Sequence, residues 1–142
     1  MTTLSARLAA IVEALPVSPG MRVLEIGGAP GAAAKAVCER IAPGGHLLVI
    51  DRSAKGVALI ERNASAEIAS GLLSVRHVAA EDFTLAPGEP PFDLAFAVRV
   101  GALDGRHPRE GIHARQRIRQ ALAPGGRLLI DGGSPLREVD LT

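Results

Sequence analysis

The chain has 142 residues, of which 47% are hydrophobic, and a formal net charge of +1. This length and composition allow one ordinary hydrophobic core, so we expect a single domain over residues 1–142 rather than a disordered chain. The balanced charge excludes a whole-chain electrostatic signal for nucleic acid or an anionic membrane. A single cysteine, Cys38, excludes an internal disulfide and a multi-cysteine metal site. We therefore expect a cytoplasmic protein with no metal, and no apolar run approaches the roughly 20 residues that a membrane span needs.

Predicted helices and strands alternate along the chain. Apolar residues at helical spacing predict a helix within residues 1–16, ahead of a core at 17–131 and a tail at 132–142. Short apolar segments predict five strands, at 21–26, 46–50, 72–78, 92–98 and 124–131. Helical spacing returns between them at 31–42, 53–69 and 108–122, with Ser53 as the expected N-cap of the second of these helices. Buried strands separated by helices predict an α/β protein with an open parallel sheet and helices on both faces.

The segment "VLEIGGAPG", residues 23–31, joins the first strand to a helix through three glycines. Glycines at such a turn let the backbone pass close under a ligand, and unpaired N–H groups at the following helix start can bind an anionic or polar group. Taken alone, the segment is equally typical of a plain tight turn. Asp51 favours a ligand, because it ends the second strand about 20 residues past Gly31, where an acid accepts hydrogen bonds from ribose hydroxyls.

A nicotinamide-dinucleotide domain is the rival nucleotide hypothesis. Its G-x-G-x-x-G pattern would place the third glycine at Ala32, and the chain has no second half to hold the nicotinamide. We therefore favour a nucleoside-type ligand of another kind.

Four segments together resemble the class I S-adenosylmethionine-dependent methyltransferases: "VLEIGGAPG", "LLVIDRSAKGVALIERN", "FDLAFAV" and "LAPGGRLLID". The resemblance covers roughly residues 17–131, and it implies a Rossmann-like sheet with strand order 3-2-1-4-5 and S-adenosylmethionine as cofactor. Ala29 departs from the family's usual middle glycine, as in those methyltransferases that have "APG" here.

By similarity, Glu25 and the glycine turn hold the methionine part of the cofactor, and Asp51 holds the ribose. Arg52 lies beside the adenine, and Glu81 or Asp82 replaces the adenine-reading acid that the family often has at Ala79. The full set of expected cofactor contacts is Glu25, Gly27, Gly28, Ala29, Gly31, Asp51, Arg52, Ala80, Glu81, Asp82 and Val98.

The acceptor is harder to derive, because methyl transfer chiefly needs alignment and demands no particular catalytic residue. The chain lacks the Asn/Asp-Pro-Pro-aromatic motif of amino-group methylases, and its lysines and its cysteine are misplaced for RNA methylation. With no Trp or Tyr and three Phe, it has little that could stack a base. We expect a small-molecule acceptor rather than a nucleic acid, with a non-catalytic cofactor-binding module as the alternative.

Residues 99–119 contain six arginines and only two acids. Most of them are typical of a solvated helix face. Arg99, at the end of the fourth strand, is the candidate for binding an anionic acceptor, and His107 is the candidate base.

The tail at 132–142 is too short, on this interpretation, for the antiparallel hairpin that follows the fifth strand in most class I methyltransferases. The fifth strand would then be an open edge, which proteins commonly cover. We expect either a homodimer through that edge or the tail folding back over it.

Overall fold

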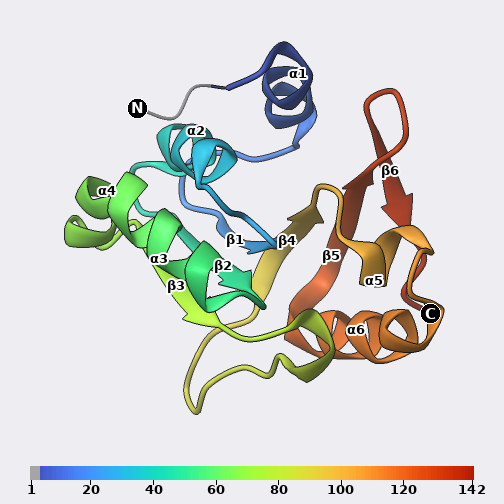
Figure 1. The fold of residues 1–142 in the computed structure, drawn as a ribbon. Helices are drawn as coiled ribbons and strands as arrows, with labels where there is room; N and C mark the ends of the chain where they lie inside the picture. The colour runs from blue at the N-terminus through green and yellow to red at the C-terminus, as the bar shows by residue number, and fades with distance from the viewer. Residues whose placement is uncertain (1–3) are drawn as a thin grey trace.

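The computed structural model describes residues 4–142 and contains one six-stranded sheet in the order β3-β2-β1-β4-β5-β6 (Figure 1). Strands β1 to β5 pair in parallel, and β6 pairs antiparallel with β5. The predicted order of the first five strands is confirmed. The strands are β1 (Arg22–Ile26), β2 (His46–Asp51), β3 (Leu73–His77), β4 (Phe92–Ala97), β5 (Leu122–Asp131) and β6 (Leu136–Val139).

Helices cover both faces of the sheet, as Figure 1 shows. On one face, α1, α2 and α3 bury side chains such as Val12, Val37 and Ile60 in one core cluster. On the other face, α5 and α6 bury Leu103 and Ile118 in a second cluster. The helices are α1 (Ala6–Ala14), α2 (Ala32–Ile41), α3 (Ala54–Asn63), α4 (Ser65–Ala69), the 3₁₀ turn η1 (Ala80–Asp82), α5 (Gly101–Asp104) and α6 (Pro108–Ala121). None of the helices described is long and apolar enough to cross a membrane.

The helix expected over 53–69 begins as predicted but is divided in two. Ser53 caps α3 by accepting a hydrogen bond from the Gly56 N–H at 3.1 Å. At the other end, the Asn63 carbonyl accepts a hydrogen bond from Lys35 Nζ at 3.1 Å, and the Asn63 amide donates to the Pro30 carbonyl at 2.9 Å. These bonds join the end of α3 to the glycine turn and to α2, and the backbone leaves the helical conformation at Ala64 before α4 begins.

The prediction that the C-terminal antiparallel hairpin is missing was wrong. A turn with positive φ at Gly132 reverses the chain after β5, and β6 pairs from Leu136 opposite Asp131 to Val139 opposite Leu128. Four residues suffice to form β6, because Leu136 and Val139 are half-buried against the two core clusters. Backfolding of the tail is thus confirmed, and the β5 edge is already paired, which removes the reason for a homodimer through that edge.

Candidate functional site

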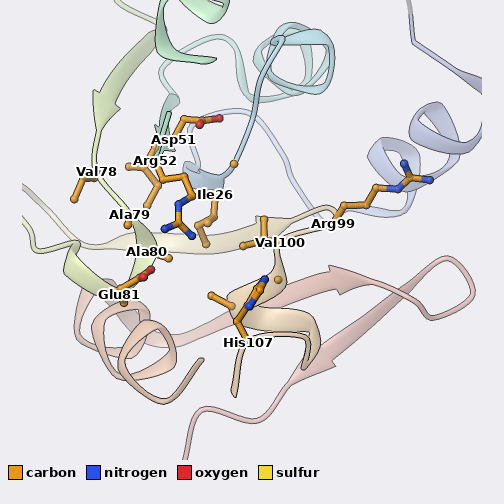
Figure 2. Close-up of a pocket in the computed structure, with 14 residues that line it drawn as sticks. Ile26, Asp51, Arg52, Val78, Ala79, Ala80, Glu81, Arg99, Val100 and His107 are labelled. Atoms are coloured by element: carbon orange, nitrogen blue, oxygen red, sulfur yellow. The ribbon is translucent and has the colours of Figure 1, made fainter. Parts of the chain in front are cut away.

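Two cavities open at the carboxyl ends of β1, β2 and β4, where ligands bind in parallel α/β sheets. The first, which we call the β2-side cavity because Ile50, Asp51 and Arg52 at the end of β2 line it, is drawn in Figure 2 and has a volume of about 200 Å³. The second, which we call the α1-side cavity because Leu8 of α1 lines it, has a volume of about 320 Å³. Both are lined by Gly27 and Arg99, so the two cavities meet at the tips of β1 and β4.

Of the eleven cofactor contacts expected from the sequence, nine line one of these cavities. Gly31 and Asp82 line neither: Gly31 is the N-cap of α2, and Asp82 is exposed at the end of η1. The β2-side cavity is lined by Gly27, Asp51, Arg52, Ala80 and Glu81. The α1-side cavity is lined by Glu25, Gly27, Gly28, Ala29 and Val98.

The turn after β1 has a backbone that only glycine fits well at two positions. Gly27 has a φ of +72°, which side chains rarely adopt. At Gly28, an added Cβ would lie 2.5 Å from Val49 Cγ1 and 2.9 Å from Glu25 Cδ. The absence of a side chain at Gly28 therefore lets the turn pack directly on the Glu25 carboxyl.

We expect Gly28→Ala to destabilise the fold by about 1–3 kcal/mol, because the new methyl group overpacks a fully buried contact. Urea denaturation of the variant measures this loss. Ala29→Gly is the matched change in the same turn; Ala29 is exposed, and we expect its loss to stay below about 1 kcal/mol, the entropic cost of an added glycine. An equal loss in both variants would contradict the packing argument.

Glu25 is an acid in an apolar position near the end of β1. Its side chain is 4% exposed, and Oε1 has no hydrogen-bond partner among the described residues. Burial, and to a smaller extent the negative charge of Asp51, raise the pKa of Glu25 to about 8. A buried, unpaired carboxyl beside a cavity is suited to a cationic group or a hydrogen-bond donor of a ligand.

Asp51 ends β2 and is 8% exposed. Its Oδ1 accepts a hydrogen bond from the Ser53 N–H at 2.9 Å, and its Oδ2 accepts a longer one from the Ala29 N–H at 3.3 Å. These bonds fix the carboxylate at the edge of the β2-side cavity, which Asp51 lines, and leave acceptor capacity on both oxygens. Asp51 can therefore bind a pair of hydroxyl groups.

Among residues 4–142, Arg99 is the one non-glycine residue with a positive φ, at 58°. The left-handed conformation costs a residue with a Cβ about 1–2 kcal/mol. Figure 2 shows that the Arg99 side chain points away from the other labelled residues of the β2-side cavity and toward α1. Arg99 therefore lies at the cleft, as expected from the sequence. Its guanidinium, however, extends toward α1 and the α1-side cavity rather than into the β2-side cavity.

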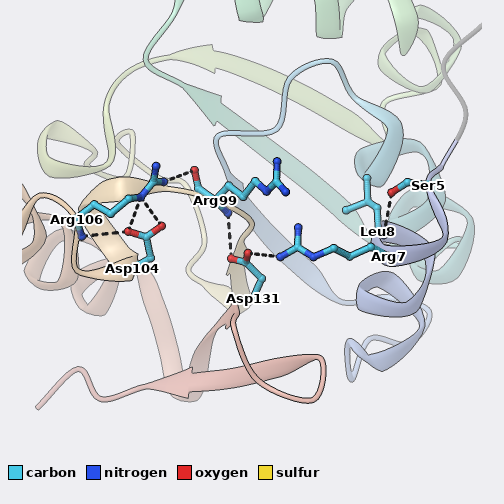
Figure 3. A network of polar contacts seen from close by, with 7 residues as sticks. All are labelled: Ser5, Arg7, Leu8, Arg99, Asp104, Arg106 and Asp131. Atoms are coloured by element: carbon cyan, nitrogen blue, oxygen red, sulfur yellow. Dashed lines mark hydrogen bonds and ion pairs between the residues drawn. The ribbon is translucent and has the colours of Figure 1, made fainter.

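Polar contacts hold the chain at Arg99, which we call the Arg99 turn, through both its N–H and its carbonyl, as Figure 3 shows. Asp131 Oδ1 accepts a hydrogen bond from the Arg99 N–H at 3.0 Å, and the Arg106 guanidinium donates to the Arg99 carbonyl at 3.0 Å. Burial alone would raise the pKa of Asp131, but the hydrogen bonds from the Arg99 amide and the Arg7 guanidinium outweigh it and hold that pKa below its usual range. Asp131 is therefore an anion with two occupied oxygens.

His107 lines the β2-side cavity from the N-cap of α6, as drawn in Figure 2. A Cβ at Gly101 would overlap its ring, at 2.3 Å from Cδ2. Gly101 therefore allows the imidazole to reach the cavity wall.

The sequence motifs missed several lining residues, because no local pattern marks them. They are apolar or small residues brought in by α1, by the segment after β3 and by the start of α5. These residues are Leu8, Val78, Val100, Gly101 and Ala102. The tight turn after β4, with its glycine two residues past Arg99, was the available signal for three of them.

Comparisons with known proteins agree with this arrangement. A model of the family described as "Protein-L-isoaspartate(D-aspartate) O-methyltransferase (PCMT)" matches residues 2–138. The chain is 34% identical over 128 residues to a protein-L-isoaspartate O-methyltransferase of Methylorubrum populi, covering 90% of this chain and 52% of that protein. It is 35% identical over 127 residues to protein-L-isoaspartate O-methyltransferase 1 of Rhodopseudomonas palustris, covering 89% and 45%. The chain thus spans about half the length of the curated relatives it matches.

Solved structures share the fold. One is an S-adenosylmethionine-dependent methyltransferase of Thiobacillus denitrificans in complex with S-adenosylhomocysteine, with a TM-score of 0.66 and 23% identity over 90% of this chain and 48% of that one. Another is described as a putative methyltransferase of Thermoplasma acidophilum, with a TM-score of 0.64 and 19% identity over 80% and 44%.

Proposed function

The chain belongs to the protein-L-isoaspartate(D-aspartate) O-methyltransferase family, and from this premise we propose that it binds S-adenosylmethionine across its two cavities and methylates a carboxylate on a protein. The observation that carries the proposal is the pair of buried acids, Glu25 and Asp51, on either side of the glycine turn. Burying the Glu25 carboxyl is costly while its Oε1 has no partner among the described residues, and a ligand donor there would offset that cost. This premise also argues against a nicotinamide dinucleotide as the ligand.

The residues present fit this cofactor at both ends. The unpartnered Oε1 of Glu25, at the α1-side cavity, would accept a hydrogen bond from the ammonium of the methionine part. Asp51 would accept hydrogen bonds from the ribose hydroxyls. Val78 and Ala80 supply apolar walls for a flat ring in the β2-side cavity, and Glu81 lies beside them to accept from an amino group.

The acceptor class follows from the relatives. The sequence favoured a small molecule, whereas the two relatives are named for L-isoaspartate in protein. A docking surface for a protein is built from residues of several elements and leaves no short motif in the sequence. We therefore propose an isoaspartyl carboxylate as the acceptor.

A carboxylate acceptor changes the roles expected of the site residues. When bound, S-adenosylmethionine supplies a methyl group on a sulfonium, so one oxygen–carbon bond forms as one sulfur–carbon bond breaks, giving a methyl ester and S-adenosylhomocysteine. A carboxyl group is already ionised at neutral pH, so no base is required. His107 would then line the site as a donor or a steric wall, and the cations Arg52 and Arg99 would attract the anionic acceptor.

Two measurements test the proposal. Calorimetric titration should detect binding of S-adenosylmethionine and S-adenosylhomocysteine. Transfer of a radiolabelled methyl group should then occur to a peptide that contains an isoaspartyl residue and not to the same peptide with a normal aspartyl residue. Absence of binding by both compounds would overturn the cofactor proposal, and binding without transfer to the isoaspartyl peptide would overturn the acceptor proposal and favour a cofactor-binding module.

A further inference from the structure

We infer that Asp131, at the end of β5, is a positioning residue for the cofactor site, because its carboxylate holds the Arg99 turn and the first turn of α1 against each other where the two cavities meet. The inference rests on the proposed cofactor binding. It adds a residue that lines neither cavity and that acts through two residues on other elements.

The first contact is with the strand tip. The Arg99 N–H donates to Asp131 Oδ1 at 3.0 Å, and the Arg106 guanidinium donates to the Arg99 carbonyl at 3.0 Å (Figure 3). A residue with a Cβ keeps a left-handed backbone only where its surroundings over-determine it. Here both backbone polar groups of Arg99 are bound by side chains from other segments, so Asp131 supplies half of that constraint.

The second contact is with α1. Arg7 Nη2 donates to Asp131 Oδ2 at 2.8 Å, and the next residue, Leu8, lines the α1-side cavity, as Arg99 does. Ser5 caps the same helical turn by accepting from the Leu8 N–H at 3.1 Å. One carboxylate therefore joins two walls of one cavity.

These contacts contribute more to the geometry of the site than to the stability of the fold. The Arg7 side chain is 52% exposed and that of Asp131 is 12% exposed, and ion pairs with an exposed partner contribute little to the free energy of unfolding. The groups that Asp131 binds are instead the backbone and side chain of cavity-wall segments. Replacing Asp131 should therefore weaken cofactor binding while leaving the chain folded.

A double-mutant cycle with S-adenosylhomocysteine as the probe tests the route through Arg99. Asp131→Ala should weaken binding about tenfold, because the Arg99 turn relaxes toward negative φ. Glycine adopts positive φ without support, so in an Arg99→Gly background the same Asp131→Ala change should cost no more than about threefold. A tenfold loss in both backgrounds, or no loss in either, would overturn the inference.

A second measurement needs no cofactor and so separates this inference from the proposed function. Amide hydrogen exchange of the folded protein should become faster in segments 5–10 and 98–101 of Asp131→Ala, since both are released. Arg127→Gln is the matched control, because it removes another exposed ion pair of the same hairpin, with Glu138 at 3.4 Å. Unchanged exchange at 5–10 and 98–101 would overturn the positioning role. A wild-type protein that does not bind S-adenosylhomocysteine would overturn the proposed function, while faster exchange in Asp131→Ala would still show that Asp131 holds these two segments.

Discussion

At pH 8.5, the Glu25→Gln variant should be more stable to urea than the wild-type chain while binding S-adenosylhomocysteine less tightly. At this pH, above its raised pKa of about 8, most of the wild-type carboxyl is ionised in a buried position where Oε1 has no partner among the described residues. Glutamine removes that charge, and we expect a gain of about 2 kcal/mol in the free energy of unfolding, less than the whole pKa shift implies because the glutamine amide is itself polar and buried. Opposite changes in stability and binding are typical of a site residue.

The pH dependence of the gain tests its cause. The pKa of Glu25 is raised from 4.5 to about 8 in the folded chain, so between these values the folded state holds one more proton than the unfolded state. The free energy of unfolding of the wild type should therefore fall as the pH rises through this window and level off above it. The variant should lack this fall, and the two proteins should differ least below pH 4.5.

Glu39→Gln is the matched control, since Glu39 is an exposed glutamate on α2. We expect it to change neither the stability profile nor the binding. A Glu25→Gln variant that is less stable than the wild type at pH 8.5 would show that Glu25 contributes to the fold rather than to a ligand site.

Asp51→Ala should weaken the binding of S-adenosylhomocysteine on the order of 100-fold. Each hydrogen bond to a charged group contributes about 1.5–3 kcal/mol, and about 1.4 kcal/mol corresponds to a factor of ten in affinity. Calorimetric titration at constant pH measures the loss. The affinity of Asp51→Asn for S-adenosylhomocysteine should lie between those of Asp51→Ala and the wild type. Because the charge of Asp51 also raises the pKa of Glu25, the stability gain of Glu25→Gln should shrink in the Asp51→Asn background.

Asp82→Ala serves as the control for Asp51→Ala. Asp82 is an exposed acid on η1 that lines neither cavity, so its loss should leave the affinity unchanged within about twofold, as is usual for surface substitutions away from a site. An equal loss of affinity in both variants would indicate that the overall negative charge, rather than the Asp51 carboxylate, supports binding.

The sequence by itself predicted the parallel sheet, from apolar runs typical of buried strands, and a ligand site formed by the glycine turn after β1 and Asp51 at the end of β2. The order of the first five strands was implied by the family resemblance, and the structure has that order. Local patterns failed where pairing between distant residues decides the structure. The β6 strand is the example, since its four residues show no clear alternation and are held by their register against β5.

Only the tertiary structure decided how the site is held together. Arg99 and Asp131 are 32 positions apart, and Arg7 and Asp131 are 124 positions apart. No periodicity along the chain could pair them. Likewise, the unpartnered oxygen of Glu25 is a consequence of packing by the glycine turn and Val49, since a carboxyl's pKa depends on what surrounds it rather than on its neighbours in sequence. The sequence thus predicted where the cofactor binds, whereas the folding of distant segments brought together the walls of that site and set the pKa of Glu25.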